Sequence, residues 1–244
     1  MNNAIEIRNL TKKFDEQPIL QGANMTIKKG EIYALLGANG AGKTTMMKCM
    51  FGILKQDSGD ITLLGERIDP TGINPIFAHI GNIIETPVFY KNLTAKENLD
   101  IHCEYLGASQ FKKDISDILI LVGLNNVTKK KVGEFSLGMK QRLALGRALI
   151  GKPQLLILDE PINGLDPMGI GAIRDILLAI NREKGTTMLI SSHIISEIEK
   201  IAHTVGIIDN GVMLSEEPLA HIKNKSTDLE TYFKEIITGG YRDV

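Results

Sequence analysis

The sequence predicts an α/β fold with a mainly parallel core sheet flanked by helices and a helical insertion at about residues 88–150. Two short segments, EIYALLG and QLLILD, are almost entirely apolar, as expected for strands buried on both faces of a sheet. Between them lies a stretch in which apolar residues recur with the 3.6-residue period of a helix. Strands that alternate with helices are typical of a parallel sheet covered on both faces.

The elements before residue 88 are predicted as strands around one helix. Ile5 and Ile7 alternate with charged residues in AIEIRNL, which indicates a half-buried strand. EIYALLG is the first buried strand, and AGKTTMMKCMFG predicts a helix that ends at Gly52. DITLLGERI predicts two strands joined by a turn at Gly65, and HIGNII predicts one more strand.

The helical insertion begins with a recognisable start signal. Thr94 and Glu97 have the spacing of a capping box ahead of the apolar positions Leu99 and Cys103. A second helix is predicted from a stripe that recurs at helical spacing: Ile115, Ile118, Leu119 and Val122.

Strand patterns return after residue 150, in QLLILD, TTMLISS and TVGIIDNGVML, the last with an Asn210-Gly211 hairpin turn. A terminal helix is predicted from its apolar stripe, with Thr227 and Glu230 as a cap and a Gly239-Gly240 end. We expect this helix to pack on its own domain rather than to form a partner surface.

Composition narrows the class of protein. The 244 residues are 43% apolar and 23% charged, with a net charge of −1, which is typical of a globular chain without a general attraction to nucleic acid. Two cysteines, Cys49 and Cys103, predict buried thiols in a reducing compartment rather than a disulfide framework. The start lacks the pattern of a signal peptide, and no apolar run approaches the ~20 residues of a membrane span.

The segment GANGAGKTT fits the phosphate-loop pattern G-x-x-x-x-G-K-[ST] between a predicted strand and a helix. Its glycines let backbone N–H groups surround phosphate oxygens, the lysine reaches the β- and γ-phosphates, and the threonine hydroxyl suits Mg²⁺. The sequence therefore predicts a nucleoside triphosphate site. Its predicted residues are Gly37, Asn39, Gly40, Ala41, Gly42, Lys43, Thr44 and Thr45.

A pair of acids follows the second buried strand. Asp159 and Glu160 end LLILDEP, and the carboxyl end of such a strand lies beside the phosphate site of an α/β sheet. Asp159 is predicted to hold Mg²⁺ through water. Glu160 is predicted to accept a proton from the attacking water.

The segment FSLGMKQRLALGRALIGKPQLLILDEP resembles the linker-peptide helix and second acidic strand of ABC ATPases, the nucleotide-binding subunits of ABC transporters. The resemblance spans residues 4–235 and implies one domain with N-terminal antiparallel strands. It implies a core at about 4–87 and 151–215, a helical subdomain at about 88–150, and a C-terminal helical segment at about 216–244.

The resemblance also implies roles for residues that complete the site of a second copy. Ser136 and Gly138 match the loop that meets the γ-phosphate of ATP held by the opposite subunit, and Asp166 in NGLDP matches the loop that links the two sites. Leu137 and Met139 depart from the common Leu-Ser-Gly-Gly-Gln pattern. The resemblance therefore does not determine how the two copies fit together at these positions.

Three further residues take their roles from the resemblance. His193 in SSH matches the histidine that contacts the γ-phosphate, and Phe14 matches the aromatic residue that stacks on adenine; a core phenylalanine is the alternative. Glu85, between apolar residues in IIETP, matches a loop glutamine that reaches the metal and the attacking water. Glu85 is therefore expected to face Mg²⁺ and the γ-phosphate, and a surface-loop acid is the alternative.

The resemblance implies an ATP-binding and ATP-hydrolysing subunit that uses ATP and Mg²⁺, pairs with a second copy of itself and works with integral membrane permease subunits at the cytoplasmic face of the membrane. With glutamate at position 85, the chain is similar to the ATPase subunits of lantibiotic self-protection and bacitracin-resistance exporters. The alternatives are an ABC ATPase acting on ribosomes or DNA, another phosphate-loop enzyme such as a kinase or GTPase, and a purely regulatory binder. The near-neutral charge and short length argue against a nucleic-acid partner.

Overall fold

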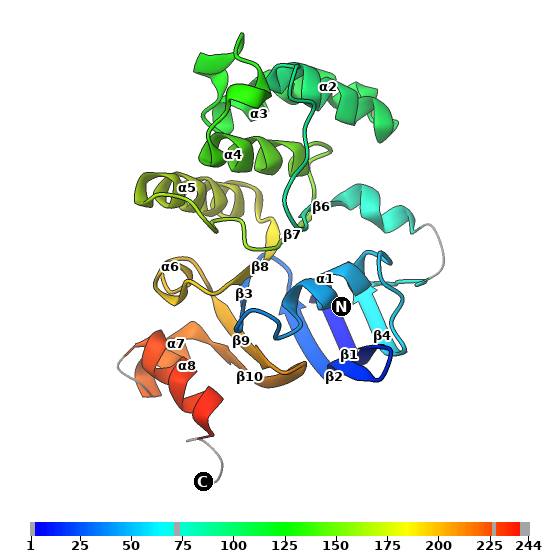
Figure 1. The fold of residues 1–244 in the computed structure, drawn as a ribbon, viewed down its shortest axis with the longest axis vertical. Coiled ribbons are helices and arrows are strands. Elements are labelled where there is room, and N and C mark those ends of the chain that lie inside the picture. Colours follow the sequence, from blue (N-terminus) through cyan, green and yellow to red (C-terminus); the bar gives the residue numbers. More distant parts are fainter. Residues whose placement is uncertain (1–2, 71–73, 226–227, 240–244) are drawn as a thin grey trace.

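The computed structural model describes residues 3–70, 74–225 and 228–239, and Figure 1 shows two sheets with helices above, between and below them. The predicted α/β class with N-terminal antiparallel strands is confirmed. Within the described residues, no helix is long and apolar enough to span a bilayer.

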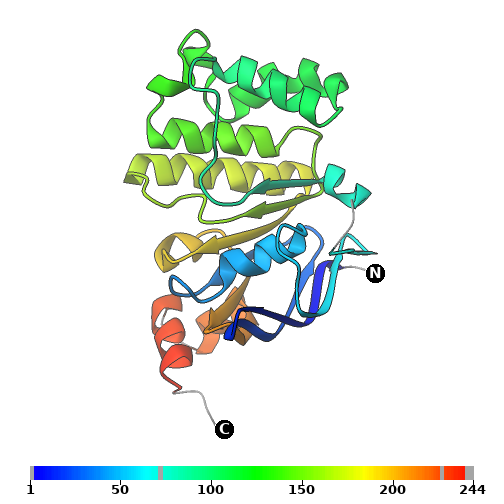
Figure 2. The same ribbon diagram turned by 45° about the vertical axis from the view of Figure 1, so that its right-hand side comes forward.

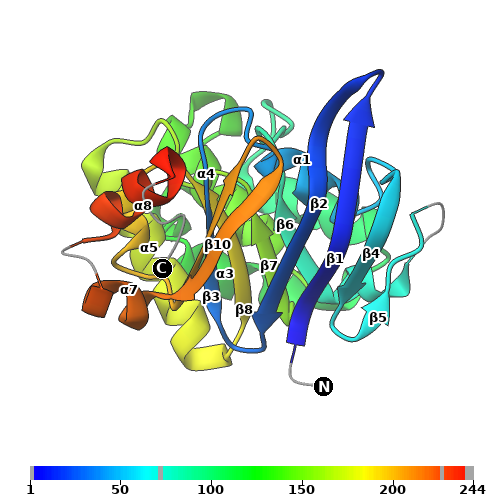
Figure 3. The ribbon, with the colours of Figure 1, turned by 90° about the horizontal axis from the view of Figure 1, so that it is seen from below.

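A four-stranded antiparallel sheet has the order β2-β1-β4-β5. Its strands are β1 (Asn3–Phe14), β2 (Gln17–Lys28), β4 (Ser58–Leu63) and β5 (Glu66–Arg67). Seen from below in Figure 3, this sheet lies to one side of the larger core sheet, with β2 next to β10. Glu216 joins the two sheets, since its Oε2 accepts hydrogen bonds from the Thr26 backbone N–H at 3.1 Å and from the Tyr33 hydroxyl at 2.9 Å.

The six-stranded core sheet has the order β10-β9-β3-β8-β7-β6. Its strands are β3 (Ile32–Leu36), β6 (Ile80–Ile83), β7 (Leu155–Leu158), β8 (Thr187–Ser192), β9 (Thr204–Asp209) and β10 (Val212–Pro218). The strands from β6 to β9 pair in parallel, and β10 returns antiparallel to β9 after the predicted turn, where Asn210 and Gly211 both have positive φ. β10 extends past residue 215, the predicted end of the core segment.

The two faces of the core sheet are buried against different layers. On β3, Tyr33 and Leu35 pack with α1 (Lys43–Met50) and the antiparallel sheet, whereas Ile32, Ala34 and Leu36 pack with the helices of the other layer. Cys49 is buried on α1, as predicted, and burial raises the pKa of its thiol to about 11, which makes it a poor nucleophile.

The other layer contains most of the helices. Its longer helices are α2 (Ala95–Tyr105), α3 (Ile115–Leu121), α4 (Leu137–Ala148) and α5 (Pro167–Lys184). Short 3₁₀ helices at Ser109–Asp114, Asn125–Val127 and Val132–Glu134 belong to this layer, whereas the 3₁₀ helix Pro75–His79 packs on the α1 side. Figure 2 shows α4 and α5 side by side, with α2 and α3 beyond α4. The capping box of α2 is confirmed, because the Glu97 backbone N–H donates to Thr94 Oγ1 at 3.3 Å and Glu97 Oε2 accepts from the Thr94 N–H at 2.6 Å.

α6 (Ile195–Ile198) lies between β8 and β9, and α7 (Leu219–Lys225) and α8 (Leu229–Thr238) follow β10. Leu229 and Tyr232 of α8 are buried against the core, so the expected packing on its own domain is confirmed. The residue that caps α8 is Asp228, whose side chain accepts from the Thr231 N–H at 2.7 Å. The predicted cap Thr227 and the terminal Gly240 lie outside the described residues.

Candidate active site

Parallel pairing brings the predicted site residues to one edge of the core sheet. In the register of the sheet, Leu36 at the end of β3 pairs with Ser192 of β8. Leu158 at the end of β7 pairs with Ile190, also in β8. The residues that follow these strand ends therefore meet at the carboxyl edge, where ligands of α/β sheets bind. They are Gly37, Asp159 and His193, and Ser191 is the penultimate residue of β8.

The phosphate loop is built in a way that requires glycine at two positions. A Cβ on Gly37 would lie 2.4 Å from the Ile208 carbonyl oxygen, and Gly42 has a φ of 107° with Ile19 O 3.0 Å from its would-be Cβ. Ala41 is buried beneath the loop, whereas Asn39 and Gly40 are exposed above it. The phosphate loop leads directly into α1, with Gly42 as the N-cap. The backbone N–H groups of the loop and of the first turn of α1 can therefore bind the same phosphate group.

Lys43 lies across the loop that precedes it. Its Nζ donates to the carbonyl oxygens of Gly37 at 2.6 Å and Ala38 at 3.1 Å, and it lies 3.5 Å from Glu160 Oε1. The side chain is only 6% exposed, so its charge is poorly screened by water. A cation held at this point is placed to receive phosphate oxygens that enter the loop.

Thr44 and Asp159 meet directly. Thr44 Oγ1 donates to Asp159 Oδ2 at 2.7 Å, and Ser191 Oγ donates to Asp159 Oδ1 at 2.6 Å. Both carboxylate oxygens of this buried acid are therefore satisfied. Ser191 was not among the predicted site residues, although its place near the end of β8, the strand next to β7, is a signal that could have identified it. Thr45 follows on α1 and is half-buried.

Glu160 and His193 form a second pair. Glu160 Oε2 lies 2.9 Å from His193 Nδ1, which leaves the other ring nitrogen, Nε2, as the one that can reach a phosphate. The Glu160 N–H donates to Ser191 Oγ at 2.8 Å, and its φ of 49° is unusual for a residue with a Cβ. Glu160 Oε1 is buried without a hydrogen bond in the described chain, so it can accept a proton.

Glu85 lies on the loop that follows β6, beside the strand end that leads to Asp159. The Asp159 N–H donates to the Ile83 carbonyl oxygen at 2.7 Å, which fixes the start of the loop. Glu85 itself has a φ of 60°, its side chain is 62% exposed, and its carboxylate forms an ion pair with Lys48. It borders a cavity of about 680 Å³ whose lining also includes Thr86, Leu137, Gln141, Asp159, Glu160, Asn163 and Gly164.

Phe14 lies at the end of β1 and the residue is 45% exposed, unlike a phenylalanine of the core. Lys12 Nζ lies 5.4 Å from the ring centroid. The exposed ring face offers a surface on which a base can stack.

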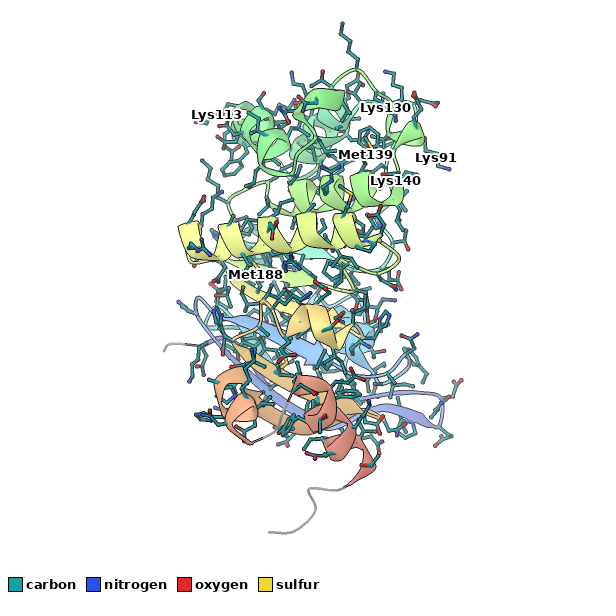
Figure 4. All side chains as sticks on the ribbon, turned by 90° about the vertical axis from the view of Figure 1, so that its left-hand side faces the viewer. Lys91, Lys113, Lys130, Met139, Lys140 and Met188 are labelled. Atoms are coloured by element: carbon teal, nitrogen blue, oxygen red, sulfur yellow. The ribbon has the colours of Figure 1, made fainter. Side chains whose placement is uncertain are left out.

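Two of the residues predicted to complete the site of a second copy, Ser136 and Asp166, are N-caps of long helices. Ser136 is the N-cap of α4, and its Oγ accepts from the Met139 N–H at 3.3 Å. Asp166 is the N-cap of α5 and accepts from the Gly169 N–H at 2.7 Å. Ser136 is exposed and Gly138 is half-buried. Figure 4 shows Met139 and Lys140 at the start of α4.

A buried lysine in a glycine-rich loop, a hydroxyl–carboxylate pair and a glutamate–histidine pair at the edge of a parallel sheet define a nucleoside triphosphatase of the phosphate-loop class. The family model described as ABC transporter matches residues 20–163. The chain belongs to this family, as an ATP-binding ATPase domain.

Relatives support this assignment along most of the chain. The bacitracin transport ATP-binding protein BcrA of Bacillus licheniformis is 46% identical over 93% of this chain and 73% of its own length. The lantibiotic transport ATP-binding protein SrtF of Streptococcus pyogenes is 45% identical over 87% of this chain and 90% of its own length. The ADP conformation of MJ1267, an ATP-binding cassette of an ABC transporter, has a TM-score of 0.83 at 26% identity, covering 98% of this chain and all of that one.

Proposed function

We propose that two copies of this chain hydrolyse ATP to power the export of an antimicrobial peptide through separate membrane subunits, at the cytoplasmic face of the membrane. The cluster of Lys43, Thr44, Asp159, Glu160 and His193 carries the proposal for ATP hydrolysis. The cargo class is supported by the two relatives above, which are named for bacitracin and lantibiotic transport.

The residues present fit a magnesium ion. Thr44 and Asp159 supply a hydroxyl and a carboxylate oxygen within 2.7 Å of each other, and Mg²⁺ favours oxygen ligands from one or two side chains with water and phosphate. When bound, the ion would neutralise charge that develops on the phosphates. Glu85 is proposed as a further contact once its ion pair with Lys48 opens.

The chain's own groups divide the remaining tasks. Lys43 binds the β- and γ-phosphates, and Phe14 stacks on adenine. Glu160 accepts the proton of the attacking water at Oε1, while its contact with His193 holds the carboxylate in place. His193 Nε2 holds the γ-phosphate.

The second copy completes the site. The exposed N-terminus of α4, with Ser136 as its cap, offers backbone N–H groups and a positive dipole end to a phosphate from another chain. Gly138 leaves room for a close approach, and Asp166 at the neighbouring N-terminus of α5 links the two sites. Because ATP lies between the copies, the pair should be weak without it.

An exposed apolar patch is proposed to meet the membrane subunits. The patch consists of Val88, Tyr90, Tyr105 and Leu106, which are 83%, 51%, 77% and 57% exposed, and the hydroxyls of the two tyrosines lie 3.3 Å apart. It adjoins the Glu85 loop, because Val88 follows Glu85 by three residues, and Arg147 on α4 donates to the Val88 carbonyl oxygen at 3.2 Å. Exposed apolar patches of this kind mark contact surfaces.

Tyr105→Glu should abolish binding to the membrane subunits while leaving the ATPase rate of the isolated chain within about twofold, since a charge in an apolar interface costs more than it does on a free surface. Co-purification with candidate membrane subunits, in parallel with ATPase assays, measures both effects. Ile120→Glu is the control, because Ile120 is 60% exposed on α3 outside the patch. Unchanged co-purification of Tyr105→Glu would contradict the assignment of this surface.

The cargo class is tested in cells. Co-expression of the chain with its membrane subunits should protect a sensitive strain against a bacitracin-type or lantibiotic peptide, and Glu160→Gln should remove the protection. Protection that persists with Glu160→Gln, or that is absent for both peptide types, would contradict the proposed export.

A further inference from the structure

The Glu85 carboxylate is held by a lysine that does not belong to the phosphate-loop pattern. Its Oε1 forms an ion pair with Nζ of Lys48, on the same helix, α1, as Lys43 and Thr44. Within the described residues, Lys48 is the partner that the structure gives to this carboxylate. The helix that presents the nucleotide-binding residues thus also holds the loop acid.

Backbone contacts hold the chain on both sides of Glu85, whereas among the described residues its side chain is held by the ion pair with Lys48 alone. On one side the Ile83 carbonyl oxygen accepts from the Asp159 N–H at 2.7 Å. On the other, the Arg147 guanidinium donates to Val88 O and lies 5.0 Å from the Phe89 ring centroid. Between these anchors the Glu85 side chain is 62% exposed, so rotation about its own bonds can move the carboxylate.

Two destinations compete for this carboxylate. One is Lys48, and the other is the cavity of about 680 Å³ that Glu85 shares with Asp159 and Glu160. A carboxylate in this cavity lies on the side of Asp159, where the proposed metal would be bound. Exposed ion pairs are weak, so that a doubly charged ion can draw the carboxylate away from a lysine.

We propose that Lys48 is a positioning residue that competes with the metal–nucleotide complex for Glu85 and thereby weakens metal binding in the wild-type chain. The inference rests on the proposed function, since it requires a metal at Thr44 and Asp159. Lys48 holds Glu85 away from the site until metal and nucleotide enter together, and takes it back when they leave.

Lys48→Met should tighten the binding of Mn²⁺, used as a probe with a non-hydrolysable ATP analogue, by about two- to fivefold, the range that exposed ion pairs contribute. The electron paramagnetic resonance signal of free Mn²⁺ gives the dissociation constant without any turnover. Lys48→Arg keeps the ion pair and should bind Mn²⁺ like the wild type. Lys48→Gln serves in place of the methionine variant if that variant does not fold.

Loss of any nearby positive charge also favours a cation, so the effect has to be traced to Glu85. In a Glu85→Gln background, Lys48→Met should tighten Mn²⁺ binding less than it does in the wild-type background, because no carboxylate remains to be released and only the general effect of the lost charge persists. Lys112→Met is the matched control, since Lys112 forms a similar ion pair with the exposed Glu104 away from the site and should leave Mn²⁺ binding unchanged.

The inference would be overturned if Lys48→Met tightened Mn²⁺ binding equally with and without the Glu85 carboxylate. It would also be overturned if the Lys48→Met single variant bound Mn²⁺ no more tightly than the wild type. Wild-type chain that fails to bind Mn²⁺ with the analogue would remove the proposed metal site as well. Wild-type binding without a lysine effect would refute only the role of Lys48.

Discussion

Glu160→Gln is expected to slow ATP hydrolysis by about 10²- to 10⁴-fold, the usual contribution of a general base. The amide keeps the size of the side chain but cannot take the proton of the attacking water. Lys43, which lies 3.5 Å from Glu160 Oε1, loses an anionic neighbour and remains able to bind phosphate. Nucleotide binding should therefore persist, and phosphate release together with equilibrium ATP binding measures both properties.

Glu183→Gln on α5 is the control, because it removes an exposed carboxylate from another part of the chain. It should hydrolyse ATP like the wild type. A Glu160→Gln variant with hydrolysis within about threefold of wild type would show that another group accepts the proton.

Lys43→Met is expected to weaken ATP binding about ten- to a hundredfold, because hydrogen bonds to charged groups contribute about 1.5–3 kcal/mol each. The Lys43 side chain is only 6% exposed, and its removal leaves the phosphate loop without a positively charged donor. Calorimetric titration with ATP and Mg²⁺ measures the loss.

Lys43→Arg tests whether charge alone is sufficient. The guanidinium is larger than the ammonium and has a planar set of donors, so it cannot occupy the space between Gly37 O, Ala38 O and Glu160. We expect this variant also to bind ATP weakly. Wild-type affinity in Lys43→Met would place the phosphates away from this lysine.

Local patterns were sufficient for much of the fold. The buried strand β3, the phosphate loop and α1 follow one another in a strand–loop–helix order that the sequence displays directly. The capping box at Thr94 and the Asn210-Gly211 turn depend only on near neighbours, and both are present. Such features can be predicted because their stabilising contacts lie within a few residues.

Other features depend on segments that are far apart. The strand β2 was not identified individually, because register shifts with β1 interrupt its alternation of buried and exposed residues. Ser191 and Asp159 meet only through the pairing of β8 with β7, and Lys48 meets Glu85 only through tertiary packing. No local pattern indicates such partners.

The central claim is that two copies enclose ATP between the phosphate loop of one and the Ser136 loop of the other. A mixture of Asn39→Cys and Ser136→Cys chains, each in the Glu160→Gln background, tests it directly by disulfide crosslinking. Asn39 and Ser136 are exposed, whereas the native Cys49 and Cys103 are buried. The account predicts a crosslinked heterodimer that forms with ATP and Mg²⁺ and is nearly absent without them; no crosslink at saturating ATP, or the same yield without nucleotide, would contradict it.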